Sequence, residues 1–134
     1  MRHVSELRVR YAETDQMGVV YHSNYLIWCE VGRTDFIRAI GASYADLERD
    51  GVALAVVEAH LRYRRPARYD ETIRVVTSVA EVRSRVVRFE YEVTSADGTV
   101  LVTGYTTLVA MSRDGKTSAI PPYLREALER VLVA

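Results

Sequence analysis

The stretch Tyr11-Ala-Glu-Thr-Asp-Gln-Met-Gly-Val-Val-Tyr-His-Ser-Asn-Tyr25 decides how this chain is interpreted, because a polar loop there joins a strand to a helix. Upstream, apolar and charged residues alternate, which predicts a short strand with Leu7, Val9 and Tyr11 on one face. Gly18 permits a tight or positive-φ turn that a side chain would resist. We therefore expect a loop that folds back over the start of the helix.

A long helix is predicted to follow, from about Tyr25 to Ile40, and Gly41 is placed to end it. Ser23 or Asn24 suits the N-cap position, because a short side-chain oxygen can accept from an unpaired helix N–H. The helix carries enough apolar residues that we expect it to be largely enclosed: Leu26, Ile27, Trp28, Cys29, Val31, Phe36, Ile37 and Ile40.

The acid Asp15 is the candidate catalytic group, because it lies just upstream of this helix start. A helix N-terminus presents unpaired backbone N–H groups and a partial positive charge. A carboxylate beside such donors suits acyl transfer, in which a base or nucleophile approaches a carbonyl while donors stabilise its oxygen. Glu13 is a rival carboxylate that ranks well below Asp15, and a nucleophilic role for Thr14 is not expected.

The rest of the chain predicts an α+β domain in two layers. A short helix is expected over Tyr44–Asp50, and a terminal helix after Pro121-Pro122 with Leu124 and Leu128 in its apolar stripe. Asp97-Gly98 is a strong hairpin signal. Strands are predicted over 52–63, 72–82, 86–94 and 99–111, the third with Val87, Phe89, Tyr91 and Val93 facing inward.

Composition narrows the class of protein. The 134 residues suit a single domain over 1–134, and a formal net charge of zero gives no reason to expect nucleic-acid binding. The single Cys29 excludes an intrachain disulfide, and its place inside the helix favours a buried, unreactive thiol. No run is long and apolar enough to span a membrane, and no signal peptide is recognised. We expect a cytoplasmic protein.

Several motifs together resemble one family. Residues 13–26, Glu30-Val-Gly-Arg33-Thr, and Tyr63-Arg-Arg-Pro-Ala-Arg-Tyr-Asp70 resemble the hotdog-fold acyl-CoA thioesterases, nearest to the 4-hydroxybenzoyl-CoA thioesterase and YbgC-like group. The resemblance implies a hotdog fold, in which an antiparallel sheet wraps around one long helix. It also implies hydrolysis of an acyl-CoA thioester to a free acid and coenzyme A, without a metal or redox cofactor. Protomers of such proteins pair, so we expect a homodimer or homotetramer with active sites between protomers.

The resemblance assigns roles to residues of the first motif. Asp15 aligns with the family's catalytic aspartate and would attack the thioester carbonyl or activate water. The backbone N–H of His22 would polarise the thioester oxygen. The His22 side chain could bind the substrate, orient Asp15 or simply pack, and Asn24 could cap the helix or position the attacking group. Gly18, Tyr21 and Tyr25 are the remaining expected substrate-binding residues near the helix start. The residue types at Tyr21, Tyr25 and Trp28 suit an acyl pocket, but aromatics at such positions more often belong to the core.

A basic cluster follows the first long strand. Four arginines occur within seven residues, and Arg64 and Arg65 are the candidates for contact with the phosphates of coenzyme A. The alternative for all four, Arg62 and Arg68 included, is a solvated face or salt bridges with acids such as Glu58 and Glu71. His60 is expected at a surface or interface rather than as a metal ligand, and His3 in a frayed terminus without a role.

Two other functions compete with hydrolysis. An enoyl-thioester hydratase or dehydratase on the same fold would work through a histidine with an acid partner, such as His22 beside Asp15. A non-catalytic scaffold would bind acyl-CoA or acyl-carrier protein without turnover. The acyl group itself, and carrier protein in place of coenzyme A, stay open at this point.

Overall fold

The protein folds around a five-stranded antiparallel sheet, seen here in a computed structural model that describes residues 1–133. In spatial order the strands are β1, β3, β4, β5 and β2. Their bounds are Arg2–Arg8 for β1, Val52–Tyr63 for β2, Thr72–Val82 for β3, Val86–Ser95 for β4 and Val100–Ser112 for β5. The strands β1 and β2 are therefore the two edges of the sheet.

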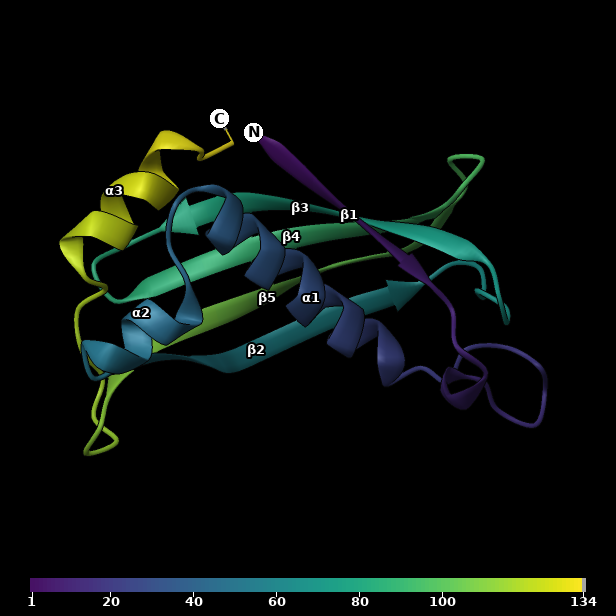
Figure 1. Cartoon of the computed structure of the whole chain (residues 1–134), viewed down its shortest axis with the longest axis horizontal. Helices are drawn as coiled ribbons and strands as arrows, with labels where there is room; N and C mark the ends of the chain where they lie inside the picture. Colours follow the sequence, from purple (N-terminus) through teal and green to yellow (C-terminus); the bar gives the residue numbers. More distant parts are fainter. Residues whose placement is uncertain (134) are drawn as a thin grey trace.

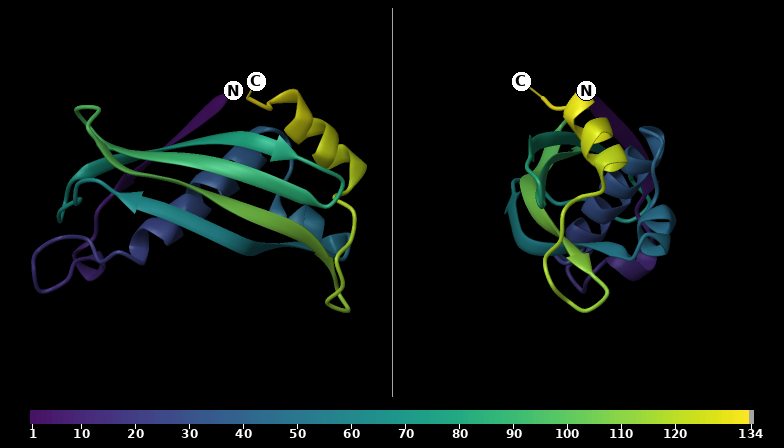
Figure 2. Two further views of the ribbon diagram at one scale, coloured as in Figure 1. Left: turned by 180° about the vertical axis from the view of Figure 1, so that it is seen from behind. Right: turned by 90° about the vertical axis from the view of Figure 1, so that its left-hand side faces the viewer.

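The sheet curves around one long helix, α1 (Asn24–Ala39), which crosses its concave face (Figures 1 and 2). The alternation predicted for β4 is confirmed, because Val87, Phe89, Tyr91 and Val93 are all buried. A strand with one face toward a helix and the other toward solvent needs this period of two. The predicted α+β arrangement, one helix embraced by an antiparallel sheet, is therefore confirmed.

A glycine lets the helix lie close to the sheet. A Cβ added at Gly32 of α1 would lie 2.6 Å from Oγ1 of Thr77 and 2.8 Å from Cγ1 of Val75, both on β3. These separations are shorter than real side chains tolerate, so the absence of a side chain at position 32 sets the spacing between α1 and the sheet.

Two shorter helices close one end of the molecule. The helix α2 (Tyr44–Arg49) begins at Ser43, whose hydroxyl accepts from the Asp46 N–H at 3.2 Å, and α3 (Pro122–Arg130) packs against β3. Met1 lies beside the end of α3, and its amino group donates to the Val131 carbonyl oxygen at 3.4 Å. No helix within residues 1–133 is both long and apolar enough to cross a membrane.

The N-terminal segment differs from the prediction. The first strand ends at Arg8, and Tyr11–Glu13 forms a 3₁₀ turn in which Tyr11 is exposed, so Tyr11 does not share the face of Leu7. The Glu13 carboxylate causes this change, because it accepts from the Arg10 N–H at 2.8 Å and draws the chain into a turn. His3 is likewise not frayed: it pairs with Thr77 across the sheet.

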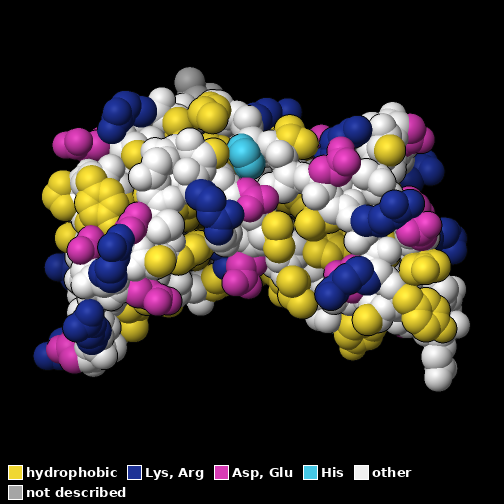
Figure 3. Space-filling model, viewed as in Figure 1, with side chains coloured by type: hydrophobic (Ala, Val, Ile, Leu, Met, Phe, Trp, Pro, Cys, Tyr) yellow, Lys and Arg dark blue, Asp and Glu magenta, His cyan; other side chains and the backbone are white. Residues whose placement is uncertain are grey.

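The helix is less enclosed than predicted. The exposed fraction of Leu26 is 40% and that of Ile27 is 52%, and on the nearby edge strand Val57 is 58% exposed. Figure 3 shows apolar side chains grouped on this side of the molecule, between its two projecting ends. The sheet of a single chain therefore leaves part of α1 and one strand edge uncovered.

Candidate active site

The loop that carries Asp15 is a small hairpin next to the start of α1. The Asp15 N–H donates to the Val19 carbonyl at 2.9 Å, and the Gly18 N–H donates to the Asp15 carbonyl at 3.0 Å. Gly18 adopts φ of +80°, as predicted. The returning segment is also held from the other side, because the Val20 N–H donates to the Ala67 carbonyl at 2.9 Å. The position of Asp15 is thus fixed by backbone bonds on both sides of the hairpin.

The Asp15 carboxylate is half-buried at the wall of a cavity of about 620 Å³. Its Oδ1 accepts from the Met17 N–H at 2.8 Å, whereas Oδ2 has no hydrogen-bond donor within residues 1–133. Gly18, Tyr11 and Tyr69 line the same cavity, and the two tyrosine rings meet edge to face with centroids 5.6 Å apart. One carboxylate oxygen therefore remains available to a substrate or a water molecule.

At the start of α1 the hydrogen-bond acceptors are backbone carbonyl oxygens, and no side-chain oxygen of residues 1–133 caps the helix. Ser23 occupies the N-cap position, but its side chain makes no capping bond. The Asn24 side chain acts as a donor instead: its Nδ2 lies 3.0 Å from the Glu13 carbonyl oxygen and 3.3 Å from the Tyr21 carbonyl oxygen. The predicted cap position is right, and the predicted acceptor role of Ser23 or Asn24 is wrong, because the loop offers carbonyl groups at this point.

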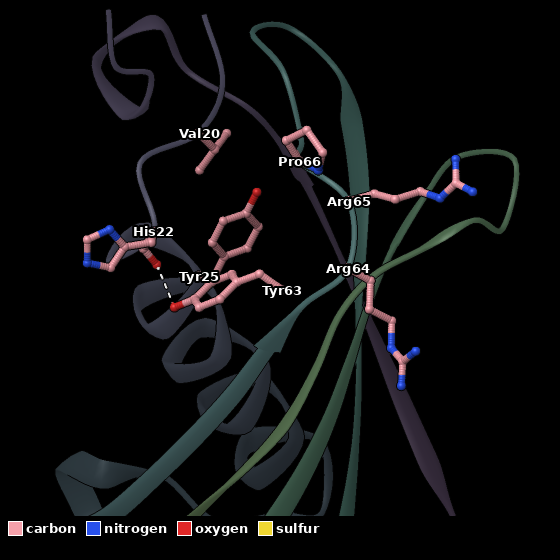
Figure 4. A pocket seen from close by; sticks show the side chains of 7 residues that line it. All are labelled: Val20, His22, Tyr25, Tyr63, Arg64, Arg65 and Pro66. Atoms are coloured by element: carbon pink, nitrogen blue, oxygen red, sulfur yellow. Dashed lines mark hydrogen bonds between the residues drawn. The ribbon is translucent and has the colours of Figure 1, made fainter. Parts of the chain in front are cut away.

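A second cavity, of about 250 Å³, opens at the helix entrance (Figure 4). Its lining residues are Val20, His22, Tyr25, Tyr63, Arg64, Arg65 and Pro66. Three aromatic residues, His22, Tyr25 and Tyr63, are among the lining, and the rings of Tyr25 and Tyr63 have centroids 5.4 Å apart. Tyr21 is not in the lining but contacts the His22 ring with centroids 4.4 Å apart. Such a lining suits an apolar or aromatic group of a ligand.

Two tyrosine hydroxyls fix this cavity. The Tyr63 hydroxyl donates to the His22 carbonyl oxygen at 3.2 Å, and the Tyr25 hydroxyl accepts from the Ala67 N–H at 3.0 Å. Burial raises the pKa of both tyrosines, so both hydroxyls keep their protons at neutral pH. The Tyr25 proton is then left to donate to a ligand.

The arginines lie at the mouth of this cavity rather than inside it. Figure 4 shows the side chains of Arg64 and Arg65 pointing away from His22 and Tyr25. Arg65 also lines a neighbouring cavity of about 500 Å³ together with Arg68 and Asp97. The guanidinium groups therefore suit the polar end of a ligand, while the aromatic lining residues suit its apolar end.

The structure groups the expected residues into two neighbouring sets. Asp15 and Gly18 line the first cavity, and His22, Tyr25, Arg64 and Arg65 line the second. Tyr21 joins the second set through its ring contact with His22, and Asn24 lies behind both as a hydrogen-bond donor. Trp28 is buried behind the Tyr25 ring and lines neither cavity, so of its two expected places, core and acyl pocket, the structure supports the core.

Two residues make contacts at the site that the sequence did not predict. Tyr63 ends β2 and reaches the helix entrance, a contact between positions 41 residues apart that no local pattern predicts. Glu13 is only 5% exposed, and both its carboxylate oxygens are occupied, by the Arg10 N–H and by Trp28 Nε1 at 2.8 Å each. Glu13 is therefore a structural acid and not a second base.

The remaining candidates stay outside the site. Cys29 is fully buried, and burial raises the pKa of its thiol to about 12, so the reactive thiolate is scarce at neutral pH. His60 is exposed on β2 and stacks on the Tyr105 ring with centroids 5.5 Å apart. Among residues 1–133, no three His, Cys, Asp or Glu side chains are grouped to hold a metal ion.

Comparison with known proteins places the chain. Residues 9–128 match the model of the thioesterase-like superfamily. YneP of Bacillus subtilis (strain 168) is 39% identical over 84% of this chain and 83% of its own length, and the acyl-CoA thioester hydrolase YbgC of Escherichia coli O6:H1 is 33% identical over 71% of each chain. The solved DHNA-CoA thioesterase of Staphylococcus aureus is 35% identical, covers 97% of this chain and 90% of its own, and superposes with a TM-score of 0.93. The expected hotdog fold is confirmed, and the chain belongs to the thioesterase-like superfamily.

Proposed function

We propose that this chain hydrolyses acyl-CoA thioesters with Asp15 as base or nucleophile and the His22 backbone N–H as the donor to the thioester oxygen. The class of enzyme follows from the family: the chain is an acyl-CoA thioesterase. One observation carries the assignment of the donor. Within residues 1–133 the His22 N–H has no hydrogen-bond acceptor, although it lies at a helix entrance and on the wall of the aromatic cavity.

The chemistry follows from these two groups. The free Oδ2 of Asp15 would attack the thioester carbon or remove a proton from the attacking water. Negative charge then develops on the carbonyl oxygen, where the His22 N–H and the positive end of the α1 dipole stabilise it. The thiolate of coenzyme A leaves, and the free acid is released after water has been consumed.

Asp15 and His22 line separate cavities in one chain, which favours an assembly of two chains. We propose a homodimer in which a second copy covers the edge strand β2 and the exposed Leu26 and Ile27. An unpaired edge with apolar neighbours is a ready surface for another strand. Such a partner would close the two cavities into one acyl pocket, and two dimers could further associate as a tetramer.

The polar part of the substrate is proposed to lie along the arginines. Arg64 and Arg65 project outward at the cavity mouth, where guanidinium groups can pair with the phosphates of coenzyme A. Acyl-carrier protein carries its thioester on the same kind of phosphate-bearing arm and is the alternative donor of the acyl group.

The test is release of free thiol from acetyl-, hexanoyl-, palmitoyl- and hydroxybenzoyl-CoA by the wild type and by Asp15→Asn. Loss of the catalytic carboxylate should lower kcat by about 10²-fold or more, as removal of one transition-state contact does. Asp114→Asn is the matched control, because that acid also belongs to a hairpin loop but lies outside both cavities.

Near wild-type turnover by Asp15→Asn would show that the mechanism is wrong. Hydration of an enoyl thioester without thiol release would favour the hydratase reading. Binding of acyl-CoA or acyl-carrier protein by the wild type, without turnover of any substrate, would favour the scaffold.

A further inference from the structure

Glu13 is a buried acid at the crossing point of the catalytic loop and α1. Its Oε1 accepts from the Arg10 N–H and its Oε2 from Trp28 Nε1, each at 2.8 Å. The Arg10 guanidinium lies 3.6 Å from the same carboxylate and is exposed to solvent. The side chain of Glu13 thus ties the 3₁₀ turn to the second turn of the helix.

The backbone carbonyl of Glu13 makes a second pair of contacts. It accepts from the Tyr21 N–H at 2.8 Å and from Asn24 Nδ2 at 3.0 Å. Because a carbonyl oxygen has two lone pairs, these two donors use its full capacity. The Glu13 carbonyl therefore holds two groups on either side of His22: the backbone of Tyr21 and the side chain of Asn24.

These contacts fix the direction of the proposed oxyanion donor. The His22 N–H belongs to the same peptide group as the Tyr21 carbonyl, which accepts from the Asn24 N–H at 3.0 Å and from Asn24 Nδ2 at 3.3 Å. In a trans peptide the C=O and N–H point in opposite directions. With the Tyr21 carbonyl held toward the helix, the His22 N–H must point away from it.

We infer that Glu13 is a positioning residue for thioester hydrolysis, which holds the Tyr21–His22 peptide and the Asp15 hairpin in one fixed relation to α1. The inference rests on the proposed role of the His22 N–H. Glu13 itself touches no substrate, because both its oxygens are occupied and its side chain lines neither cavity. Its effect on the reaction is transmitted through the bonds to Tyr21, Asn24 and Trp28.

The substitution that tests the inference is Glu13→Gln, which keeps the shape of the side chain. Both partners of Glu13 are N–H donors, whereas an amide offers one oxygen and one NH₂ group. One donor must therefore face another donor, and the loop has to shift. A displacement of about 1 Å in a catalytic group can cost about 10²-fold in rate, so we expect kcat to fall by about 10- to 100-fold with KM changed less than about twofold.

The single tryptophan supplies a readout that does not depend on activity. Trp28 is the only tryptophan of the chain, so the NMR signal of its indole N–H is unique. Glu13→Gln should move this signal upfield, because a charged acceptor is replaced by a neutral group. In a Trp28→Phe background one of the two competing donors is gone, and the same Glu13→Gln change should lower kcat less than in the wild type.

A second pair of variants tests the hydrogen bonds to the Glu13 and Tyr21 carbonyls and leaves the Glu13 side chain unchanged. Asn24→Ala removes the amide donor from the Glu13 and Tyr21 carbonyls and should lower kcat several-fold. Ser23→Ala is the matched control, because Ser23 is the adjacent residue at the same helix end and its side chain makes no capping bond. It should leave kcat unchanged.

The outcomes separate the inference from the proposed function. An unmoved indole signal in Glu13→Gln, or a moved signal with unchanged kcat, would overturn the positioning role. A fall in thermal stability with full activity of the folded protein would show a merely structural acid and overturn it too. If Asp15→Asn stays active while Glu13→Gln loses kcat, the proposed role of Asp15 fails and the positioning role of Glu13 stands.

Discussion

Replacing Tyr25 by phenylalanine removes one oxygen atom from the interior of the protein. Tyr25 is 2% exposed, and its hydroxyl accepts from the N–H of Ala67, a residue with no exposed surface. The carbonyl of Ala67 meanwhile accepts from Val20 N–H. The one contact thus joins the start of α1 to the turn between Arg65 and Arg68, and the buried Ala67 N–H has no other acceptor within residues 1–133.

The cost can be estimated from the group that is left behind. A buried backbone N–H without an acceptor costs about 1–3 kcal/mol. For a chain of this length, 1 kcal/mol corresponds to roughly 3–4 °C in Tm, so Tyr25→Phe should lower Tm by about 3–12 °C. The KM for acyl-CoA should also rise, because Arg64 and Arg65 lie just before the loosened Ala67.

Tyr63→Phe is the matched control, because it removes the same atom from a neighbouring tyrosine. Tyr63 is 48% exposed, and its hydroxyl donates to the His22 carbonyl at 3.2 Å. Water can hydrate that carbonyl after the change, so the loss of stability should stay within about 0.5 kcal/mol. Urea unfolding of both variants at one protein concentration measures the difference, which must be compared at equal concentration if the protein is a dimer. Equal losses in the two variants would refute the reasoning.

Two further changes test the surface and the core. Val57→Arg places a charge on the exposed edge strand and should convert the proposed dimer to monomers with the fold intact. Sedimentation measures the mass of the particle, and a variant that is still a dimer would exclude this edge as the interface. Burial raises the pKa of Cys29 to about 12 and the pKa of Tyr91 to about 12, so the folded chain keeps two protons that the unfolded chain releases above about pH 9–10. The free energy of unfolding should therefore fall as pH rises from about 9 to 12, and urea midpoints that stay constant over this range would contradict these buried protons.

The parts of the structure that the sequence predicted are those set by neighbouring residues. The hairpin at Asp97-Gly98 forms as expected, with the Ser95 N–H donating to the Thr99 carbonyl at 2.9 Å and Gly98 at φ of +87°. The long helix is found within one residue of its predicted bounds. Each of these depends on the preferences of a few adjacent side chains, which a single sequence displays directly.

The parts that could not be predicted depend on contacts across the fold. Nothing near Glu13 in the sequence shows that its carboxylate will meet an indole 15 residues away, so the sequence ranked it below Asp15 as a base but could not identify its structural role. Leu26 and Ile27 fit the apolar pattern of an enclosed helix, but periodicity cannot tell whether a chain's own sheet or a second copy covers that face. Asn24 is a residue type that often caps helices through its side-chain oxygen. Here two nearby backbone carbonyls are present, so its side-chain NH₂ group donates hydrogen bonds instead.

The proposed reaction depends mainly on contacts between residues close in the sequence, whereas the choice of acyl group depends on contacts across the fold. This difference explains which features the sequence could predict. The proposed catalytic groups, Asp15 and the His22 N–H, lie in one short segment, and most of the contacts that hold them come from residues between Arg10 and Trp28. Tyr63 and Ala67 support this segment from elsewhere in the chain. The groups that would select the acyl chain are spread over β2, the segment after it and the surface left open for a second copy. A sequence can therefore indicate the reaction while leaving the substrate open. The same division implies that acyl preference can change through β2 and its partner while residues 10–28 stay as they are.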